Sequence, residues 1–334
     1  MKAAIIDQYG DASVFKLAAV KDPTYHATEV LIKIEAASVN PIDWKIRKGM
    51  LRFIVPLKFP AILGFDISGE VIAVGNKVTK FKVGDSVFGW SNLRGGQGYA
   101  QYIALDEQNI LNRPWTLSAF EAAGAPLAGE TALQVLRDYG KVKAGQEVLI
   151  IGAAGGVGLF AMQLAKIFGA KITAVCGGHS IPLVKSLGAD HIIDYQKESL
   201  PASSNSYDLI FDAVSKHSFE KTKHLLKPSG IYVSTLPSIT AIVALIKNLF
   251  RPQKEYFIVA KNSVTDLTYL KTLFEQNKLQ TIIDRTFPLH KIAQAHQYSE
   301  TEHAHGKIII AIHSYDVVDE ASEESFPASD SPAW

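Results

Sequence analysis

Four glycines between residues 152 and 158 are the clearest chemical signal in this sequence. The segment Gly152–Gly158 directly follows Glu147–Ile151, an apolar run typical of a buried strand. A strand, a glycine turn and a helix in succession bind the diphosphate of a dinucleotide, because the backbone can approach the phosphates and the helix start offers free N–H groups. A tight turn without a ligand is the alternative, but so many glycines would destabilise a plain turn. We assign Gly155, Gly156 and Val157 to cofactor binding.

The end of the next expected strand, Lys171–Cys176, indicates which nicotinamide cofactor fits. NAD-binding proteins place an acidic residue on the ribose hydroxyls at such a position, whereas Lys171–Ser180 contains no acid. Gly177, His179 and Ser180 offer room, a hydroxyl and a titratable charge, all of which suit a 2′-phosphate. The segment therefore predicts NADPH rather than NADH, although His179 would also fit a solvated loop.

Two further residues are expected to line the cofactor groove. Val214 ends the expected strand Asp208–Val214, and Leu236 follows the expected strand Gly230–Thr235. Ligands of parallel sheets lie at the carboxyl ends of the strands. We therefore add Val214 and Leu236 to the candidate cofactor residues.

The elements around these residues predict a mixed α/β fold. Residues 1–122 alternate short apolar runs with Gly, Pro, Asn and Asp, which is typical of a β-rich, barrel-like domain. Residues 123–264 alternate apolar strands with helical segments, which predicts a parallel sheet covered by helices. Residues 265–313 add two helices and two strands, and the sequence leaves open whether these extend the parallel sheet or return to the first domain. We expect them to return in part.

Composition limits the partners and the location. The 334 residues carry a net charge of +1, so no overall field attracts nucleic acid. The longest apolar stretch, Ile239–Ile246, is far shorter than the roughly 20 residues of a membrane span. Cys176 is the single cysteine and cannot form an intramolecular disulfide, which favours a reducing compartment. We expect a cytoplasmic protein without nucleic-acid or membrane partners.

Two segments stand outside the domain pattern. Ser314–Trp334 contains six acidic residues and no basic one, which predicts a disordered tail. The tail is either a passive appendage or a docking peptide anchored by Phe326 and Trp334. Ser238–Phe250 is apolar on nearly every side, so another element or a subunit contact must cover it.

Seven short segments also carry a family resemblance, and they are Ala37–Asp43, Leu63–Val71, Val83–Gly89, Pro126–Ala132, Gly152–Gly158, Leu187–Asp190 and Lys227–Gly230. They resemble the medium-chain dehydrogenase/reductase superfamily, in particular its zinc-independent, NADPH-dependent quinone oxidoreductase-like branch, over most of residues 1–312. The resemblance implies an N-terminal β-rich GroES-like barrel domain and a Rossmann domain with a doubly wound parallel sheet.

The sequence departs from the zinc-containing members of that superfamily. Those proteins have a Cys where this chain has Asn40 and a His where it has Phe65, and their four-cysteine lobe is missing. His303 and His305 have no third ligand in view and are interpreted as surface side chains. We predict no metal. A quinone or enone needs a Lewis acid less than an isolated ketone does, because hydride addition gives a delocalised anion.

The resemblance implies roles for several residues. Asn40 would lie beside the nicotinamide and donate to the acceptor oxygen, and Thr131 would contact the nicotinamide end. Tyr195 matches a position that contacts the adenosine phosphate region, although a packing aromatic is nearly as good an interpretation. Asp43 is a candidate proton relay, but a carboxylate that caps the helix at Trp44–Lys48 is the stronger interpretation. A homodimer built on the nucleotide domain is also implied.

Together these observations predict a zinc-independent oxidoreductase that transfers hydride from NADPH to a quinone or a related conjugated carbonyl. One alternative is an NADPH-dependent reductase of 2-enone or 2-alkenal double bonds. The other is an NADPH-binding regulatory or interaction protein that uses its C-terminal tail. Related enoyl-thioester reductases have a tyrosine proton donor where this chain has Met50 and Leu51, which weighs against that substrate class.

Overall fold

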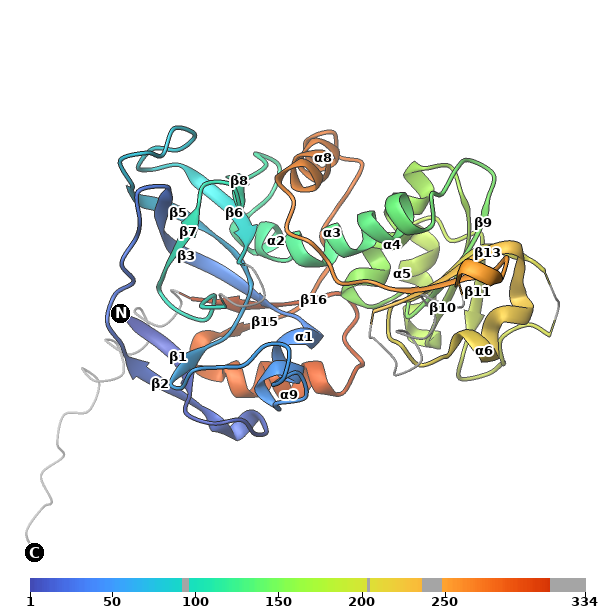
Figure 1. Cartoon of the computed structure of the whole chain (residues 1–334), viewed down its shortest axis with the longest axis horizontal. Coiled ribbons are helices and arrows are strands. Elements are labelled where there is room, and N and C mark those ends of the chain that lie inside the picture. The colour runs from blue at the N-terminus through green and yellow to red at the C-terminus, as the bar shows by residue number, and fades with distance from the viewer. Residues whose placement is uncertain (92–95, 203–204, 236–247, 313–334) are drawn as a thin grey trace, which may run out of the picture.

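The computed structural model describes residues 1–91, 96–202, 205–235 and 248–312. They form two halves, each built on its own sheet system (Figure 1). One half combines the N-terminal strands with the last strands, β15 (Ile283–Pro288) and β16 (Lys307–Ala311), and the other contains a parallel sheet. Helices α3 (Pro126–Gln134) and α4 (Gly156–Ile167) lie in the middle of the view. The predicted mixed α/β fold is confirmed.

The sheet-rich half contains a three-stranded sheet in the order β2-β1-β4 and a seven-stranded sheet in the order β15-β16-β3-β5-β6-β8, with β7 paired to β3. Alternate side chains of β3, among them Val30, Ile32 and Ile34, are completely buried, as expected for a strand with one face on the core. The bounds of the remaining strands are β1 (Lys2–Ile6), β2 (Phe15–Ala19), β3 (Glu29–Val39), β4 (Ala61–Ile62), β5 (Asp66–Val74), β6 (Ser86–Trp90), β7 (Tyr102–Asp106) and β8 (Ile110–Asn112).

The C-terminal elements return to this half. Strand β16 pairs antiparallel with β3, where Ile310 lies opposite Ala37. The last strands therefore join the sheet of the N-terminal strands and do not extend the parallel sheet, a choice that the sequence left open. The helices of this half are α1 (Pro41–Arg47), α2 (Ala119–Ala123) and α9 (Ile292–Glu300), while α8 (Val264–Glu275) contacts both β8 and α3.

The second half contains a six-stranded parallel sheet in the order β11-β10-β9-β12-β13-β14. Numbered along the chain within this sheet, the order is 3-2-1-4-5-6, that of a Rossmann fold. Val148, Leu149 and Ile150 of β9 are all completely buried, because helices cover both faces. The bounds are β9 (Glu147–Ile151), β10 (Lys171–Cys176), β11 (His191–Asp194), β12 (Tyr207–Asp212), β13 (Leu226–Ser234), β14 (Lys254–Phe257), α5 (Ile181–Ser186) and α6 (Phe219–Thr222).

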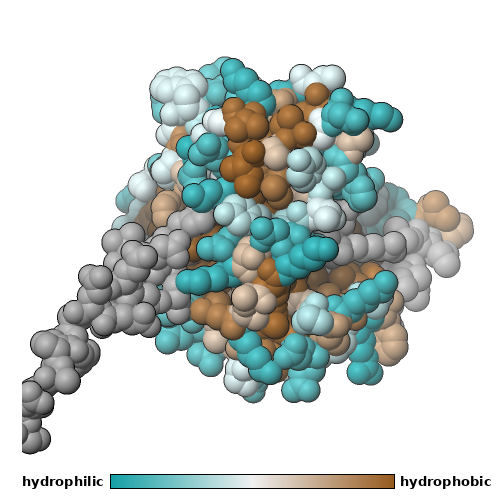
Figure 2. Space-filling view, turned by 90° about the vertical axis from the view of Figure 1, so that its left-hand side faces the viewer, coloured by the Kyte–Doolittle hydropathy of each residue, from teal (hydrophilic) through white to brown (hydrophobic). Residues whose placement is uncertain are grey.

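Several predictions lie outside the described residues. They concern Leu236, most of the apolar segment Ser238–Phe250, and the tail Ser314–Trp334. No helix within the described ranges is both long and apolar enough to span a bilayer. At the end of the sheet-rich half, hydrophobic side chains gather in separate groups among hydrophilic ones, so the coloured residues form no single continuous apolar surface there (Figure 2).

Candidate cofactor and active site

The glycine turn joins β9 to α4 in a geometry that requires glycine. Gly152 has a φ of +76°, and a Cβ there would lie 2.5 Å from Cγ1 of Val214. A Cβ on Gly158 would lie 2.2 Å from the carbonyl oxygen of Gly152. A Cβ on Gly155, in contrast, would meet only that oxygen, at 3.5 Å. The space before Gly155 is therefore open at the start of α4, where backbone N–H groups have no helical partner.

A short segment of the other half packs against this turn. It consists of His305, Gly306 and Lys307 and is called the 305–307 segment below. A Cβ on Gly156 would lie 2.8 Å from Cδ of Lys307 and 3.4 Å from the carbonyl oxygen of Gly306. Gly306 itself has a φ of +131°, and a Cβ there would lie 2.5 Å from the carbonyl oxygen of Ile282. The two halves of the molecule thus meet at the glycine turn, with glycine on both sides of the contact.

One end of the 305–307 segment leads to a buried polar group, the inner cluster, formed by Lys307, Asn40 and Asp66. Lys307 Nζ donates to Asn40 Oδ1 at 2.5 Å and lies 3.4 Å from Asp66 Oδ2, while Asn40 Nδ2 donates to Asp66 Oδ2 at 2.9 Å. Because an ammonium only donates and a carboxylate accepts, these partners determine which way the Asn40 amide points. None of the three residues is more than 4% exposed. Burial lowers the pKa of Lys307, against the opposing effect of the Asp66 and Asp43 charges.

Asp66 connects the inner cluster to the helix that carries Thr131. Its Oδ1 accepts the backbone N–H of Leu127 at 2.9 Å, and its Oδ2 accepts the hydroxyl of Ser38 at 2.7 Å. Thr131 lies one turn further along α3, where its hydroxyl donates to the carbonyl oxygen of Leu127 at 2.6 Å. The hydroxyl hydrogen of Thr131 is therefore used within the helix, and its oxygen remains an acceptor.

Asp43 lies next to Asn40 at the start of α1. Its Oδ2 accepts the backbone N–H of Asn40 at 2.6 Å. The helix begins at Pro41 rather than at Trp44, so Asn40 is its N-cap and Asp43 lies in its first turn as the partner in a capping box. Burial raises the pKa of Asp43 to about 7; the hydrogen bond from Asn40 opposes this rise and the charge of Asp66 adds to it. The Asp43 carboxyl can thus hold a proton near neutral pH.

The other end of the 305–307 segment reaches the loop after β10 and forms the outer cluster, made of Gly177, His179, Ser180, Tyr195 and His305. His305 Nε2 lies 2.5 Å from His179 Nε2, and His305 Nδ1 lies 2.9 Å from Ser180 Oγ. A Cβ on Gly177 would lie 3.3 Å from His179 Cε1 and 3.4 Å from the Tyr195 hydroxyl. The structure therefore brings together four residues that were expected at the adenosine end of the cofactor, and it adds His305.

An acidic residue that the sequence analysis did not consider lies beside this loop. A Cβ on Gly178 would lie 2.8 Å from Oδ2 of Asp194, at the end of β11. Lys197 Nζ lies 3.4 Å from the same oxygen and offsets its charge. Asp194 ends β11, the strand that pairs with β10, and therefore lies outside the segment Lys171–Ser180 that follows the glycine turn.

Sequence reasoning missed the functional candidates Lys307, Asp66 and His305. Lys307 directly precedes the apolar run of its strand, and this was the only hint in the sequence that the lysine would be buried with a partner. Asp66 lies within one of the family segments. His303 and His305 were interpreted together as surface side chains; His303 is exposed, whereas His305 is half-buried and contacts the loop after β10.

The residues at the expected zinc positions do not fit a zinc ion. Asn40 presents an amide that Lys307 and Asp66 already engage, and Phe65 presents a buried phenyl ring. Within the part of the chain that the structure describes, no three His, Cys, Asp or Glu side chains are placed to hold a metal. The absence of a metal remains a prediction.

Family models match both halves of the chain. Residues 26–115 match the alcohol dehydrogenase GroES-like domain, and residues 187–310 match the zinc-binding dehydrogenase model. The chain is 36% identical to the chloroplast envelope quinone oxidoreductase homolog of Arabidopsis thaliana, over 90% of this chain and 95% of the relative. It is 34% identical to the NADPH-dependent alkenal/one oxidoreductase of the same plant, over 93% and 79%. The quinone oxidoreductase structure from Coxiella burnetii superposes with a TM-score of 0.85 at 35% identity, covering 93% of this chain and 99% of that one.

These relatives overturn one expectation. Plant relatives are named as chloroplastic or chloroplast envelope proteins, so the prediction of a cytoplasmic location is wrong and the relatives point to the chloroplast. The prediction rested on a single cysteine, which bears on disulfides and does not identify a compartment.

Three findings agree with one another. They are the two family matches, the identity to quinone oxidoreductase relatives along nearly the whole chain, and the presence of a GroES-like and a Rossmann half. The chain belongs to the medium-chain dehydrogenase/reductase superfamily, in its quinone oxidoreductase-like branch.

Proposed function

We propose that this chain is an oxidoreductase that transfers hydride from NADPH to a quinone or a related conjugated carbonyl. The observation that carries the proposal is the 305–307 segment, which places the buried Lys307–Asn40–Asp66 group directly beside an open glycine turn. Relatives named quinone oxidoreductase and NADPH-dependent alkenal/one oxidoreductase support this activity.

The residues around the turn fit a dinucleotide. Gly155 leaves open the space that a side chain would fill, and the N–H groups of Gly156 and Val157 lie in the first turn of α4. The methylenes of Lys307 pack beside Gly156, and its ammonium lies further along in the inner cluster. When bound, the cofactor supplies the hydride.

The inner cluster would position the acceptor and polarise its oxygen. Lys307 has three N–H groups, of which Asn40 and Asp66 engage two. The second N–H of Asn40 makes only a 3.4 Å contact with Ser38 Oγ. These two groups can donate to the oxygen on which negative charge develops, in a site from which water is largely excluded. Asp43, which can hold a proton near neutral pH, lies within one hydrogen bond of the Asn40 backbone.

Steady-state oxidation of NADPH tests the activity. We expect turnover with a benzoquinone or naphthoquinone and with an α,β-unsaturated ketone, and none with the matching saturated ketone. Dialysis against a chelator should leave the rate unchanged, because Asn40 and Phe65 replace zinc ligands. Turnover of the saturated ketone that is lost with the chelator would contradict the proposal, and so would failure of all conjugated acceptors.

We also propose that the chain forms a homodimer through β14. In the described chain no strand pairs with the outer edge of β14. The Asn248 amide bonds both the N–H and the carbonyl oxygen of Glu255, so the apolar residues beside this edge, rather than its backbone, would carry the contact. Leu249 and Phe250, just before this strand, are 77% and 85% exposed.

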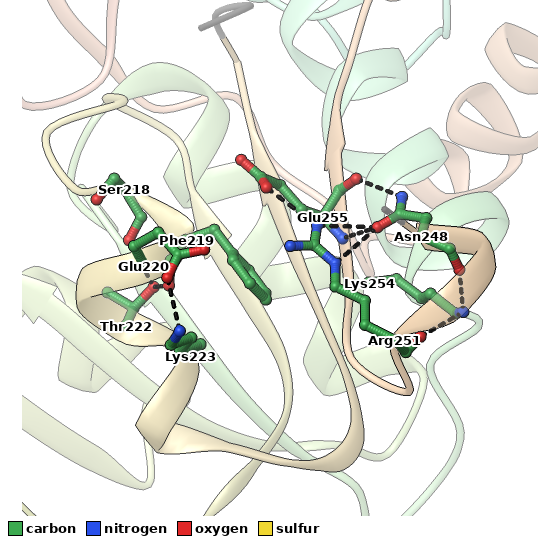
Figure 3. Close-up of polar contacts among 9 residues, drawn as sticks. All are labelled: Ser218, Phe219, Glu220, Thr222, Lys223, Asn248, Arg251, Lys254 and Glu255. Carbon is green, nitrogen blue, oxygen red and sulfur yellow. Dashed lines mark hydrogen bonds and ion pairs between the residues drawn. The ribbon is translucent and has the colours of Figure 1, made fainter. Parts of the chain in front are cut away.

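A polar network holds the backbone beside these two residues (Figure 3). Asn248 Oδ1 accepts from Arg251 at 2.9 Å and from the backbone N–H of Glu255 at 3.0 Å, and Arg251 pairs with Glu255 at 3.0 Å. Lys254 donates to the Arg251 carbonyl oxygen at 2.7 Å, and the Arg251 guanidinium lies 4.0 Å from the centre of the Phe219 ring. These hydrogen bonds hold the backbone next to Leu249 and Phe250 in place, as a preformed interface requires.

Sedimentation of two variants tests the dimer. Phe250→Glu should give a monomer, whereas Val83→Glu, at an exposed position of the sheet-rich half, should leave the dimer intact. A monomeric wild-type protein, or a Phe250→Glu protein that remains dimeric, would contradict the proposal.

A further inference from the structure

We infer that His305 is a specificity-determining residue that binds the 2′-phosphate of NADPH together with His179 and Ser180. The inference rests on the proposed function, and it assigns part of the nucleotide site to a residue of the other half of the molecule. It also makes the preference for NADPH depend on pH.

The geometry of the outer cluster suits a phosphate. The two imidazole Nε2 atoms lie 2.5 Å apart, so in the neutral pair one nitrogen donates and the other accepts. The rings meet edge to face, with centres 4.0 Å apart, and the Ser180 hydroxyl contacts the remaining nitrogen of His305 at 2.9 Å. A phosphate would take the place of this contact: the two rings would move apart, and each Nε2 could then donate to a phosphate oxygen.

The position of His305 along the chain agrees with this role. Gly306 and Lys307, the next two residues, lie against Gly156 of the glycine turn. Strand β10 pairs with β9 so that Val175 lies opposite Ile151, which brings the end of β10 beside the same turn. A dinucleotide whose diphosphate occupies the turn therefore has the outer cluster within reach on the side of the next strand, where the adenosine ribose of such cofactors is bound.

Neighbouring groups fix the backbone of His305 and shift the pKa of its ring. The backbone N–H of His305 donates to Asp284 Oδ2 at 3.1 Å, and Tyr298 donates to the same oxygen at 2.7 Å. Burial lowers the pKa of His305; His179, His303 and Arg285 add to the lowering, and Asp284 opposes it. On the other side, the loop of His179 faces the Tyr195 hydroxyl and Asp194, which Lys197 partly neutralises.

These charges predict how binding depends on pH. Without a phosphate, burial disfavours the protonated form of His305, and a bound dianion would raise the pKa of this ring. Proton uptake on binding makes NADPH affinity increase as the pH falls from 8.5 to 6.5. The range stays above the second pKa of a phosphate, about 6, so the ligand keeps most of its charge. NADH has no 2′-phosphate and should show no such trend.

Calorimetric titration of the full chain tests the assignment. The probes are adenosine 2′,5′-bisphosphate and adenosine 5′-monophosphate, which differ only in the 2′-phosphate, followed by NADPH and NADH. His305→Ala should weaken the two 2′-phosphorylated ligands by about tenfold or more, as expected for the loss of a charge-assisted hydrogen bond, and should leave the other two within about twofold. His305→Arg should restore the preference and remove its dependence on pH. His26→Ala, at an exposed position of the sheet-rich half, is the control and should behave as wild type.

Three outcomes would overturn the inference. His305→Ala could weaken all four ligands equally, which would indicate a packing role. The variant could leave every affinity and the pH trend unchanged, in which case the proposed function would stand without His305. Finally, the wild-type chain could bind neither NADPH nor NADH, and then the proposed function would fall together with the inference.

Discussion

The two ends of the 305–307 segment differ in the environment they give to charge. At the inner end Lys307 is buried, and a carboxylate and an amide compensate its charge. At the outer end His305 is only partly buried, and its principal partner is a second histidine. A compensated buried group holds a fixed geometry, whereas a half-buried titratable pair responds to the ligand and to pH. The contrast agrees with the proposed roles, in which the inner cluster serves the chemistry and the outer cluster selects the cofactor.

A substitution in the glycine turn, which lies between the two clusters, should have the largest effect on cofactor binding. Gly155→Asp places a negative charge in the open space before α4, so binding of NADPH and NADH should both fall by at least about 100-fold. Gly155 is the N-cap of α4, and aspartate is a favoured N-cap, so the melting temperature should stay the same or rise. Titration and thermal unfolding together check this. Gly155→Ala is the control and should bind almost normally; retained binding in Gly155→Asp would remove the turn from the cofactor site.

At the inner cluster, Lys307→Met should lower turnover with both cofactors and destabilise the protein. Asp66 would be left as a buried charge without its cation, which costs about 3–5 kcal/mol. The double variant Lys307→Met with Asp66→Asn removes both charges and should recover most of the free energy of unfolding, but not the turnover. If turnover returns with stability, Lys307 is a structural residue and the assignment of the inner cluster to chemistry is wrong.

At the outer cluster, Gly177→Asp should change cofactor preference and little else. The backbone φ at Gly177 is −79°, which any residue adopts, and the new carboxylate would lie near His179 and Tyr195. We expect the ratio of NADPH to NADH affinity to fall by about tenfold or more. Gly177→Asn has the same shape without the charge and should shift the ratio much less. An unchanged ratio in Gly177→Asp would place the 2′-phosphate elsewhere.

The smallest effect is expected from Asp43, beside the inner cluster. Its pKa of about 7 in the folded chain exceeds the ordinary 3.8, so between these values the folded state keeps a proton that the unfolded state releases. The stability that this proton contributes is present at low pH and is lost as the pH rises through about 7. Relative to Asp43→Asn, the wild-type free energy of unfolding should fall by about 1–4 kcal/mol between pH 5 and pH 8.

Denaturant titrations at several pH values check the Asp43 prediction. The control is Asp7→Asn, which makes the same charge change at an exposed carboxylate. Parallel pH curves for the wild type and Asp43→Asn would show that Asp43 is ionised in the folded state.

The sequence predicted those features that neighbouring residues encode. The strand, glycine turn and helix around Gly155 are one continuous segment, and the loop from Gly177 to Ser180 follows the next strand directly. Strand β14 was not predicted, because its Lys-Glu-Tyr-Phe sequence is half-exposed at a sheet edge and lacks an apolar run.

The inner cluster could not be predicted in the same way. Asn40, Asp66 and Lys307 are brought together by the antiparallel pairing of β16 with β3 and of β3 with β5. The expected partial return of residues 265–313 to the first domain did not specify that the strand of Lys307 would pair with β3. For the same reason the sequence suggested a surface position for His305, although the fold places it beside Ser180.

A crystal structure with bound NADPH tests the central claim most directly. The account predicts the diphosphate on the backbone N–H groups of Gly156 and Val157, the 2′-phosphate between His179 and His305, and the nicotinamide beside Asn40 and Lys307. A dinucleotide bound away from the glycine turn, or no bound nucleotide at saturating concentration, would contradict it.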